Sequence, residues 1–319
     1  MIENCEAAQM IRVNGEGRIE IFKPLEEAFE VTKQVLFRPF DAKKWFVIGF
    51  AAWLSQLGTG NYNFNPNRED WKNTPIIQNF LAWLSEIPRP VLIGGIVALV
   101  VLVLVIAIVL AWLRARGRFM FIDCIVKNRG AIAEPWREFR EQGNSLFLFS
   151  LVVGILLSII VGTAALPFLL PLIRNAGFAH PDVYMICAII AWAFVLIALI
   201  FAWTLIAHFM AVIMYRRRCL AREAFRVGVS LISNYPGEIT LYCLFWIALG
   251  IGAGIVSCVV ILATCCVAIL PYIGTVILLP VYLCLRAFGL RFIRQFGPEY
   301  DVWAGIAQAP QAPPPPLPV

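Results

Sequence analysis

Charged residues are scarce in this sequence. Aspartate, glutamate, lysine and arginine together make up 14% of the 319 residues, whereas hydrophobic residues make up 61%. Soluble domains carry about 25% charged residues, so the composition excludes a soluble globular protein. The mean hydropathy of +0.80 indicates an integral membrane protein instead.

The sequence also lacks the motifs of known catalytic and metal-binding sites. It contains no HExxH, Walker or GxSxG pattern, and neither of its two histidines has the cysteine or carboxylate spacing of a metal ligand. The pattern Gly250-x-Gly252-x-Gly254 lies inside an apolar run without a preceding strand, so close helix packing explains it better than nucleotide binding. We therefore expect no enzyme activity and no cofactor.

Two further absences narrow the function. None of the nine cysteines belongs to a CxxC pair, and six lie in apolar runs, where cysteine acts as a small hydrophobe. The chain has no exposed basic domain of the kind that binds nucleic acid. No aspartate or glutamate lies within a long apolar run, and proton-coupled transporters place carboxylates at that depth. A proton relay is accordingly disfavoured.

The long apolar runs predict the fold class. Residues 90–113 form an uncharged run of 24 residues, which as a helix reaches about 36 Å and crosses a hydrocarbon core of about 30 Å. The other runs cover residues 45–57, 143–173, 183–215 and 239–285, and the last is long enough for two crossings. We predict an all-α polytopic transmembrane helix bundle with six spans.

The first run is the weakest of these predicted spans. Residues 45–57 reach only about 20 Å as a helix, which leaves open whether this segment is a complete span or a re-entrant one. The distribution of charge favours a complete span, because a re-entrant segment would invert every later loop. The boundary between the fifth and sixth spans stays open as well.

Basic residues indicate how the chain is oriented. With six spans, 22 lysines and arginines fall on the side of the termini and four on the other side. Positively charged loops stay in the cytoplasm, so both termini are predicted to be cytoplasmic. We divide the chain into a cytoplasmic segment with an amphipathic helix (1–44), the six-span membrane domain (45–296) and a disordered proline-rich tail (297–319).

Arginines gather at the predicted cytoplasmic ends of the spans. Such clusters attract anionic lipid head groups, and aromatic residues between them suggest amphipathic collars in the interface. Arg286 lies close to this set, near the end of the sixth span. The predicted lipid or partner contacts are Arg114, Arg116, Arg118, Arg216, Arg217, Arg218, Arg291 and Arg294.

One further residue is a candidate for function. His208 is the only Asp, Glu, His, Lys or Arg residue well inside a predicted span, and an ionisable group at that depth is by default a functional candidate. It could line a substrate path. A neutral histidine hydrogen-bonded to a neighbouring helix explains its position equally well.

Several loop segments carry a resemblance to a known family. These segments are RPFDAKKWF at 38–46, RGRFMF at 116–121, Asn128-Arg129, and EPWREFR at 134–140. They resemble an uncharacterised family of bacterial multi-pass membrane proteins, and the layout is loosely similar to the membrane domains of some bacterial glycerophosphodiester phosphodiesterases. The resemblance implies the bacterial cytoplasmic membrane as the location and brings no activity with it.

A weak internal repeat accompanies these segments. Glu27-Ala28-Phe29, Glu134-Pro135-Trp136 and Glu223-Ala224-Phe225 each open an amphipathic segment ahead of a pair of spans. Three copies of a surface helix followed by a membrane hairpin would produce this pattern. Short loops that contain a glutamate beside an aromatic residue would produce it too.

Two functions are compatible with the sequence. The first is a non-enzymatic integral membrane protein whose basic cytoplasmic collars contact membrane lipids or another membrane or cytoplasmic protein. The alternative is a transporter or channel for a neutral or lipidic substrate, with His208 on the path.

Overall fold

The computed structural model describes residues 20, 22–57, 79, 88–174, 183–264 and 270–304. Within these ranges the chain forms helices joined by short connections and no strand, which confirms the all-α prediction. Most of the first 21 residues and the proline-rich stretch of the tail lie outside the described residues.

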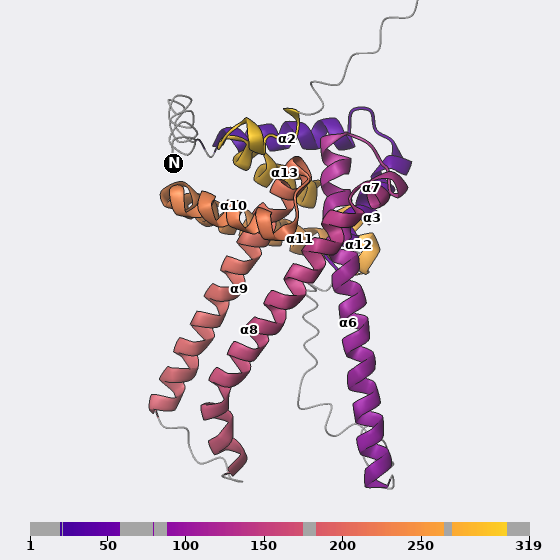
Figure 1. Cartoon of the computed structure of the whole chain (residues 1–319). Coiled ribbons are helices and arrows are strands. Elements are labelled where there is room, and N and C mark those ends of the chain that lie inside the picture. The colour runs from indigo at the N-terminus through magenta and orange to yellow at the C-terminus, as the bar shows by residue number, and fades with distance from the viewer. Residues whose placement is uncertain are drawn as a thin grey trace, which may run out of the picture.

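The molecule has two regions of different character (Figure 1). One is a compact group of helices, which we call the head. From it the apolar parts of three long helices, which we call the legs, extend and diverge. The leg helices are α6 (Arg89–Val126), α8 (Arg140–Arg174) and α9 (Val183–Arg217).

The legs and α11 (Pro236–Ala263) are the membrane-length helices of the described residues. Four helices there are long and apolar enough to cross a membrane, and the most apolar stretches of α6, α9 and α11 contain no residue buried inside the molecule. Val103, for example, is 56% exposed. Because burying one such side chain is worth about 1.5–3 kcal/mol, a surface of this kind requires apolar surroundings.

The head is formed by shorter helices packed around the charged ends of α6 and α9. Its aromatic core includes Phe119, Phe209, Phe288 and Phe292, which are fully buried. The shorter elements are α2 (Phe22–Leu36), α3 (Ala42–Ser55), α7 (Ala133–Glu138), α10 (Ala221–Asn234), α12 (Pro271–Ile277), α13 (Leu279–Arg294) and the 3-10 helix η2 (Pro298–Tyr300).

Helix α3 corresponds to the first predicted span, and it lies in the head. Asp41 caps it by accepting hydrogen bonds from the backbone N–H groups of Lys43 and Lys44. At this end the Lys44 ammonium donates to Asn128 at 2.7 Å. At the other end a Cβ on Gly117 would lie 2.7 Å from backbone atoms of Leu54 and Ser55. Helix α3 therefore runs beside the head portion of α6, with 14 residues that reach about 21 Å.

The predicted sixth span is divided between α12 and α13, which meet at Leu278. Helix α12 packs against α3: the Trp45 indole N–H donates to the carbonyl of Val276 at 3.0 Å, and the Tyr272 hydroxyl donates to the carbonyl of Phe46 at 3.1 Å. The described residues thus show four helices of membrane length, and six spans stay a prediction. Apolar composition alone does not distinguish a span from a helix in a buried core.

Two predicted surface helices are amphipathic as expected. Helix α2 buries Ala28, Val31 and Val35 against the head and exposes Glu30 and Lys33 on its other side. Helix α10 lies across the top of α9 in Figure 1 and buries one face, which includes Ala224 and Leu231. The third segment of the proposed repeat, α7, has only six residues, so the threefold repeat stays a prediction.

Candidate functional site

Along α6 and α9, the apolar part of each leg ends in an ionisable side chain at one level, where the legs join the head. The uncharged run of α6 ends at Arg114 after 24 residues, and that of α9 ends at His208 after 25 residues. Counted from the far ends of the legs, both residues lie about 36 Å away. The arginines that the sequence singles out lie at this level or further into the head, and the structure divides them into two groups.

Arg116 belongs to the group with internal partners. Its guanidinium lies over the rings of Trp112 and Trp136, at 4.5 and 4.7 Å from their centroids, and donates to the Asn144 side chain at 3.0 Å. Only 8% of Arg116 is exposed. Because these partners come from α6, α7 and α8, the residue joins three helices of the head.

Arg217 and Arg218, at the head end of α9, are also paired inside the molecule. Arg217 forms an ion pair with Glu299, and Arg218 forms one with Glu138. Arg218 further lies over the ring of Phe139 at 4.0 Å. Burial opposes ionisation of Glu138, but hydrogen bonds from Arg218 and Lys127 outweigh that effect and lower its pKa.

Arg291 and Arg294 hold the C-terminal part of the described chain against α13. Arg291 pairs with Glu27 at 3.2 Å and lies over the Trp303 ring at 4.0 Å. Arg294 pairs with Asp301 at 3.0 Å. Five of the eight predicted lipid contacts therefore have internal partners: Arg116, Arg217, Arg218, Arg291 and Arg294.

A buried carboxylate that the sequence analysis did not single out organises a second charged cluster. Asp123 is fully buried and forms ion pairs with Lys127 at 2.8 Å and Arg129 at 3.1 Å. It also accepts a hydrogen bond from the Tyr215 hydroxyl at 3.0 Å. Its spacing of four residues from Lys127 on one helix is the signal that could have indicated it. We call Asp123, Lys127, Arg129 and Tyr215 the Asp123 cluster.

The second group of arginines has no acidic partner. Arg114, Arg118 and Arg286 form no ion pair among the described residues. Arg118 lies within electrostatic reach of both Arg114 and Arg286. Burial lowers the pKa of Arg286 to about 10, because it disfavours the charged form.

His208 joins this group through Arg286. The Arg286 Nη1 atom lies 2.9 Å from His208 Nδ1. Because a guanidinium only donates, Nδ1 is the acceptor, which makes the imidazole neutral with its proton on Nε2. We call Arg114, Arg118, Arg286 and His208 the Arg286 cluster. Sequence reasoning singled out His208, but Arg286 is 78 residues away and nothing in the sequence links the two.

Several polar atoms of the Arg286 cluster are buried without a hydrogen-bond partner. Within the described part of the chain, Arg286 Nε and Nη2, His208 Nε2 and Arg114 Nε are buried and have no hydrogen-bond partner. Buried polar groups are normally paired. Every one of these atoms is a donor, so the cluster offers hydrogen bonds to an acceptor that the described residues do not supply.

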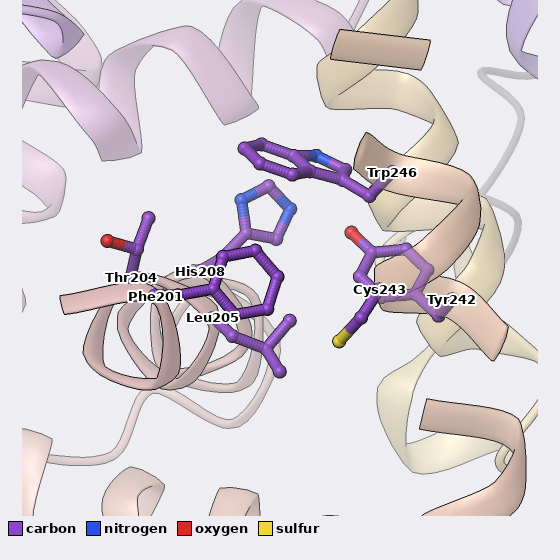
Figure 2. Close-up of a pocket in the computed structure, with 7 residues that line it drawn as sticks. All are labelled: Phe201, Thr204, Leu205, His208, Tyr242, Cys243 and Trp246. Carbon is purple, nitrogen blue, oxygen red and sulfur yellow. The ribbon is translucent and has the colours of Figure 1, made fainter. Parts of the chain in front are cut away.

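A cleft between α9 and α11 leads to His208 (Figure 2). Its inner volume is about 30 Å³. The imidazole projects from α9 towards α11. The lining residues are Phe201, Thr204, Leu205, His208, Tyr242, Cys243 and Trp246.

Fold and site define an all-α protein with several membrane-length apolar helices beneath an arginine-rich head. The chain belongs to a family of unknown function, DUF7544, whose model matches residues 19–298. This membership confirms the predicted link to an uncharacterised family; the bacterial origin and the phosphodiesterase-like layout stay predictions. No curated protein and no solved structure matches the chain.

Proposed function

We propose that this chain is a non-enzymatic integral membrane protein whose head lies at the cytoplasmic surface and contacts anionic lipid head groups. The observation that carries the proposal is the set of cationic side chains at the level of the leg ends that lack acidic partners. Anionic lipids supply the missing charge, and each Lys or Arg near such a surface contributes about 1 kcal/mol.

The orientation follows from the distribution of lysine and arginine. Helices α2 and α13, near the two ends of the described chain, meet in the head, where Arg291 pairs with Glu27. The basic loops and the arginine-rich head share that side, which the positive-inside rule assigns to the cytoplasm. The bacterial cytoplasmic membrane is the expected location.

Helix α10 carries the most accessible of these cations. It lies across the top of α9 in Figure 1, as a helix in the interface would. Arg222 and Arg226 are exposed on it, and neither has an ion-pair partner among the described residues. Arg216, the last of the predicted contacts, is likewise without an ion pair in the described part of the chain. Arg217 and Arg218, in contrast, are held by Glu299 and Glu138 and contribute less to a lipid surface.

Lipid enrichment around the reconstituted protein tests the proposal. The double variant Arg222→Gln/Arg226→Gln is placed in nanodiscs of mixed phosphatidylglycerol and phosphatidylcholine, and the lipids that leave with the protein on mild detergent extraction are counted. We expect phosphatidylglycerol enrichment to fall about fivefold per arginine, which corresponds to about 1 kcal/mol each.

Helix α2 offers a matched control. Lys23 and Lys33 are exposed on this helix, which lies on the side of the head away from the legs in Figure 1. Lys23→Gln/Lys33→Gln should leave the enrichment unchanged. Equal enrichment in the wild type and in the α10 variant would contradict the proposed role of the head.

A second candidate function is passage of a neutral or lipidic molecule beside His208. The position of His208 on the wall of the cleft favours it. The narrow inner volume of about 30 Å³ suits a water molecule but no larger solute, so this function requires a wider conformation. Vesicles containing the protein that show no flux of small neutral solutes or of labelled lipid would remove it.

Contact with another membrane or cytoplasmic protein also remains a proposal. Arg137 and Arg140 are exposed near α7 and form no ion pair among the described residues. An acidic partner surface would suit them, and purification under gentle conditions with and without an Arg137→Glu/Arg140→Glu change would reveal such a partner.

A further inference from the structure

We propose that the Arg286 cluster is a discrete binding site for a phosphate group, and that the phosphate belongs to an anionic lipid whose acyl chain lies along the exposed apolar side of α9, at the mouth of the cleft between α9 and α11. This inference rests on the proposed function for the source of the phosphate. It goes beyond that function because it assigns one site with a defined chemistry, separate from the exposed basic surface of α10.

The unused hydrogen-bond donors of the cluster indicate the kind of ligand that it binds. Arg286 retains two buried donors, Nε and Nη2, after Nη1 has been used on His208. His208 retains Nε2–H, since its Nδ1 is the acceptor in that bond. Three unused donors match a group that only accepts, and phosphate oxygens are such acceptors.

The charge of the cluster selects an anion over a neutral acceptor. Arg118 stands within electrostatic reach of Arg114 and Arg286, and His208 within reach of Arg286 and Arg118. No carboxylate among the described residues forms an ion pair with any of these arginines. Like charges gathered in a partly buried place repel one another, and an anion among them removes that repulsion.

The cleft explains why the anion is the head group of a lipid. Its walls carry the apolar side chains of Phe201, Leu205 and Trp246. Figure 2 shows these side chains on the two helices around the imidazole. The apolar lining continues into the leg of α9, where Ile197 and Ile200 are exposed. A molecule with a phosphate at one end and a hydrocarbon chain at the other satisfies both parts of the site.

Close packing around the imidazole holds its free nitrogen in place. A Cβ at position 289 would lie only 2.3 Å from His208 Nε2, and 3.2 Å from the Tyr242 hydroxyl oxygen. Glycine at this position of α13 therefore allows the ring to sit between α9, α11 and α13. The donor is thus fixed by three helices before any ligand arrives, which is the preorganisation that favours binding.

The test titrates the full-length, delipidated protein with three separate probes: dioctanoyl phosphatidylglycerol, dioctanoyl phosphatidylcholine and inorganic phosphate. Native mass spectrometry counts bound molecules and thermal unfolding gives Tm. We expect one tight phosphatidylglycerol site in the wild type. Arg286→Gln should weaken it at least tenfold, because charge-assisted hydrogen bonds are lost, and His208→Phe should weaken it in the same direction.

Thermal unfolding separates a binding role from a structural one. Arg286→Gln removes a buried charge without an acidic partner, so the delipidated variant should melt at or above the wild-type temperature and lose the increase in Tm that phosphatidylglycerol produces in the wild type. A variant that melts lower than the wild type and keeps the full increase would overturn the proposal.

The α10 variant separates this inference from the proposed function. Arg222→Gln/Arg226→Gln should lose general enrichment and keep the single tight site. If Arg286→Gln keeps the tight site while the α10 variant loses enrichment, the Arg286 cluster is not the binding site. The proposal that the head contacts anionic lipids is then still supported. If inorganic phosphate displaces phosphatidylglycerol and binds at least as tightly, with both dependent on Arg286, the phosphate site is supported and its lipid source is refuted.

Discussion

The Asp123 cluster and the Arg286 cluster are two charged groups in one head, and they differ in composition. In the Asp123 cluster a fully buried carboxylate meets two cations and a hydroxyl group, all within 3.1 Å. In the Arg286 cluster three guanidinium groups and an imidazole meet no acid among the described residues. Both lie between α6 and the neighbouring helices of the head.

This difference teaches how to separate a structural cluster from a binding site. A cluster whose charges are neutralised internally stabilises the packing of its helices, and losing one member takes a partner away from the others. A cluster whose donors are unused is costly without a ligand and gains from one. The expected signs of the mutational effects are therefore opposite, and the predictions below test that contrast.

The largest expected effect comes from Asp123. Asp123→Asn keeps the shape of the side chain and removes the charge that Lys127 and Arg129 share. Breaking a buried ion pair from one side costs about 3–5 kcal/mol. Because Lys127 and Arg129 keep Glu138 and Glu134 as partners, we expect a loss at the lower end, about 3 kcal/mol, and a lower Tm in detergent. Glu141→Gln, an exposed carboxylate without an ion pair in the described chain, is the control and should change little.

A gain in stability is expected from the opposite cluster. Replacing Arg286 by glutamine in delipidated protein removes a buried charge that lacks an acidic partner, and we expect stabilisation of about 1–3 kcal/mol. The measurement is Tm after exhaustive exchange of lipid for neutral detergent. A loss of stability as large as that of Asp123→Asn would erase the contrast between the two clusters.

Tyr215→Phe examines the link between α6 and α9 within the Asp123 cluster. The change removes the hydroxyl that donates to Asp123 and keeps the ring that stacks on Phe139 at 4.8 Å. A hydrogen bond to a charged group is worth about 1.5–3 kcal/mol, and we expect a loss near the lower figure. In the Asp123→Asn background the same change should cost clearly less, because its partner is already neutral.

The smallest effect is a dependence on pH through Glu138. Its pKa in the folded protein lies below the ordinary value of 4.5, so its contribution to stability is present above the unfolded pKa and is lost as pH falls through the folded pKa. Because the side chain is 30% exposed and partly screened, we expect less than about 1 kcal/mol. The Tm difference between wild type and Glu138→Gln should be present at pH 7 and shrink as the pH is lowered below 4.5.

The apolar legs could be predicted from sequence because no other structure suits their residues. Residues 90–113 contain no charge and no polar face, so α6 has no way to pack as a surface helix of a soluble domain. Helix α3 could not be placed in this way. Its apolar residues suit a bilayer and a protein core equally, and contacts of Lys44 with Asn128 and of Trp45 with Val276 decide for the head.

The sequence likewise could not show which arginines of the site have an internal partner. Arg217 and Arg286 both stand near the ends of apolar runs and look alike in sequence. The carboxylate that neutralises Arg217 is Glu299, which is 82 residues away. The imidazole that meets Arg286 is 78 residues away. Since pairing depends on which distant residues are brought together, no local pattern distinguishes an occupied guanidinium from an unused one.

The sequence by itself determined the class of this protein: uncharged runs long enough to cross a bilayer, basic residues at one end of them, and a single histidine in the apolar part of α9. These are properties of composition and spacing, and they act through the solvent that each stretch requires. The tertiary structure alone decided which charges are neutralised internally and which remain unpaired. The physical reason is that an ion pair or hydrogen bond forms over about 3 Å in space, whereas partners such as Glu27 and Arg291 come from opposite ends of the described chain.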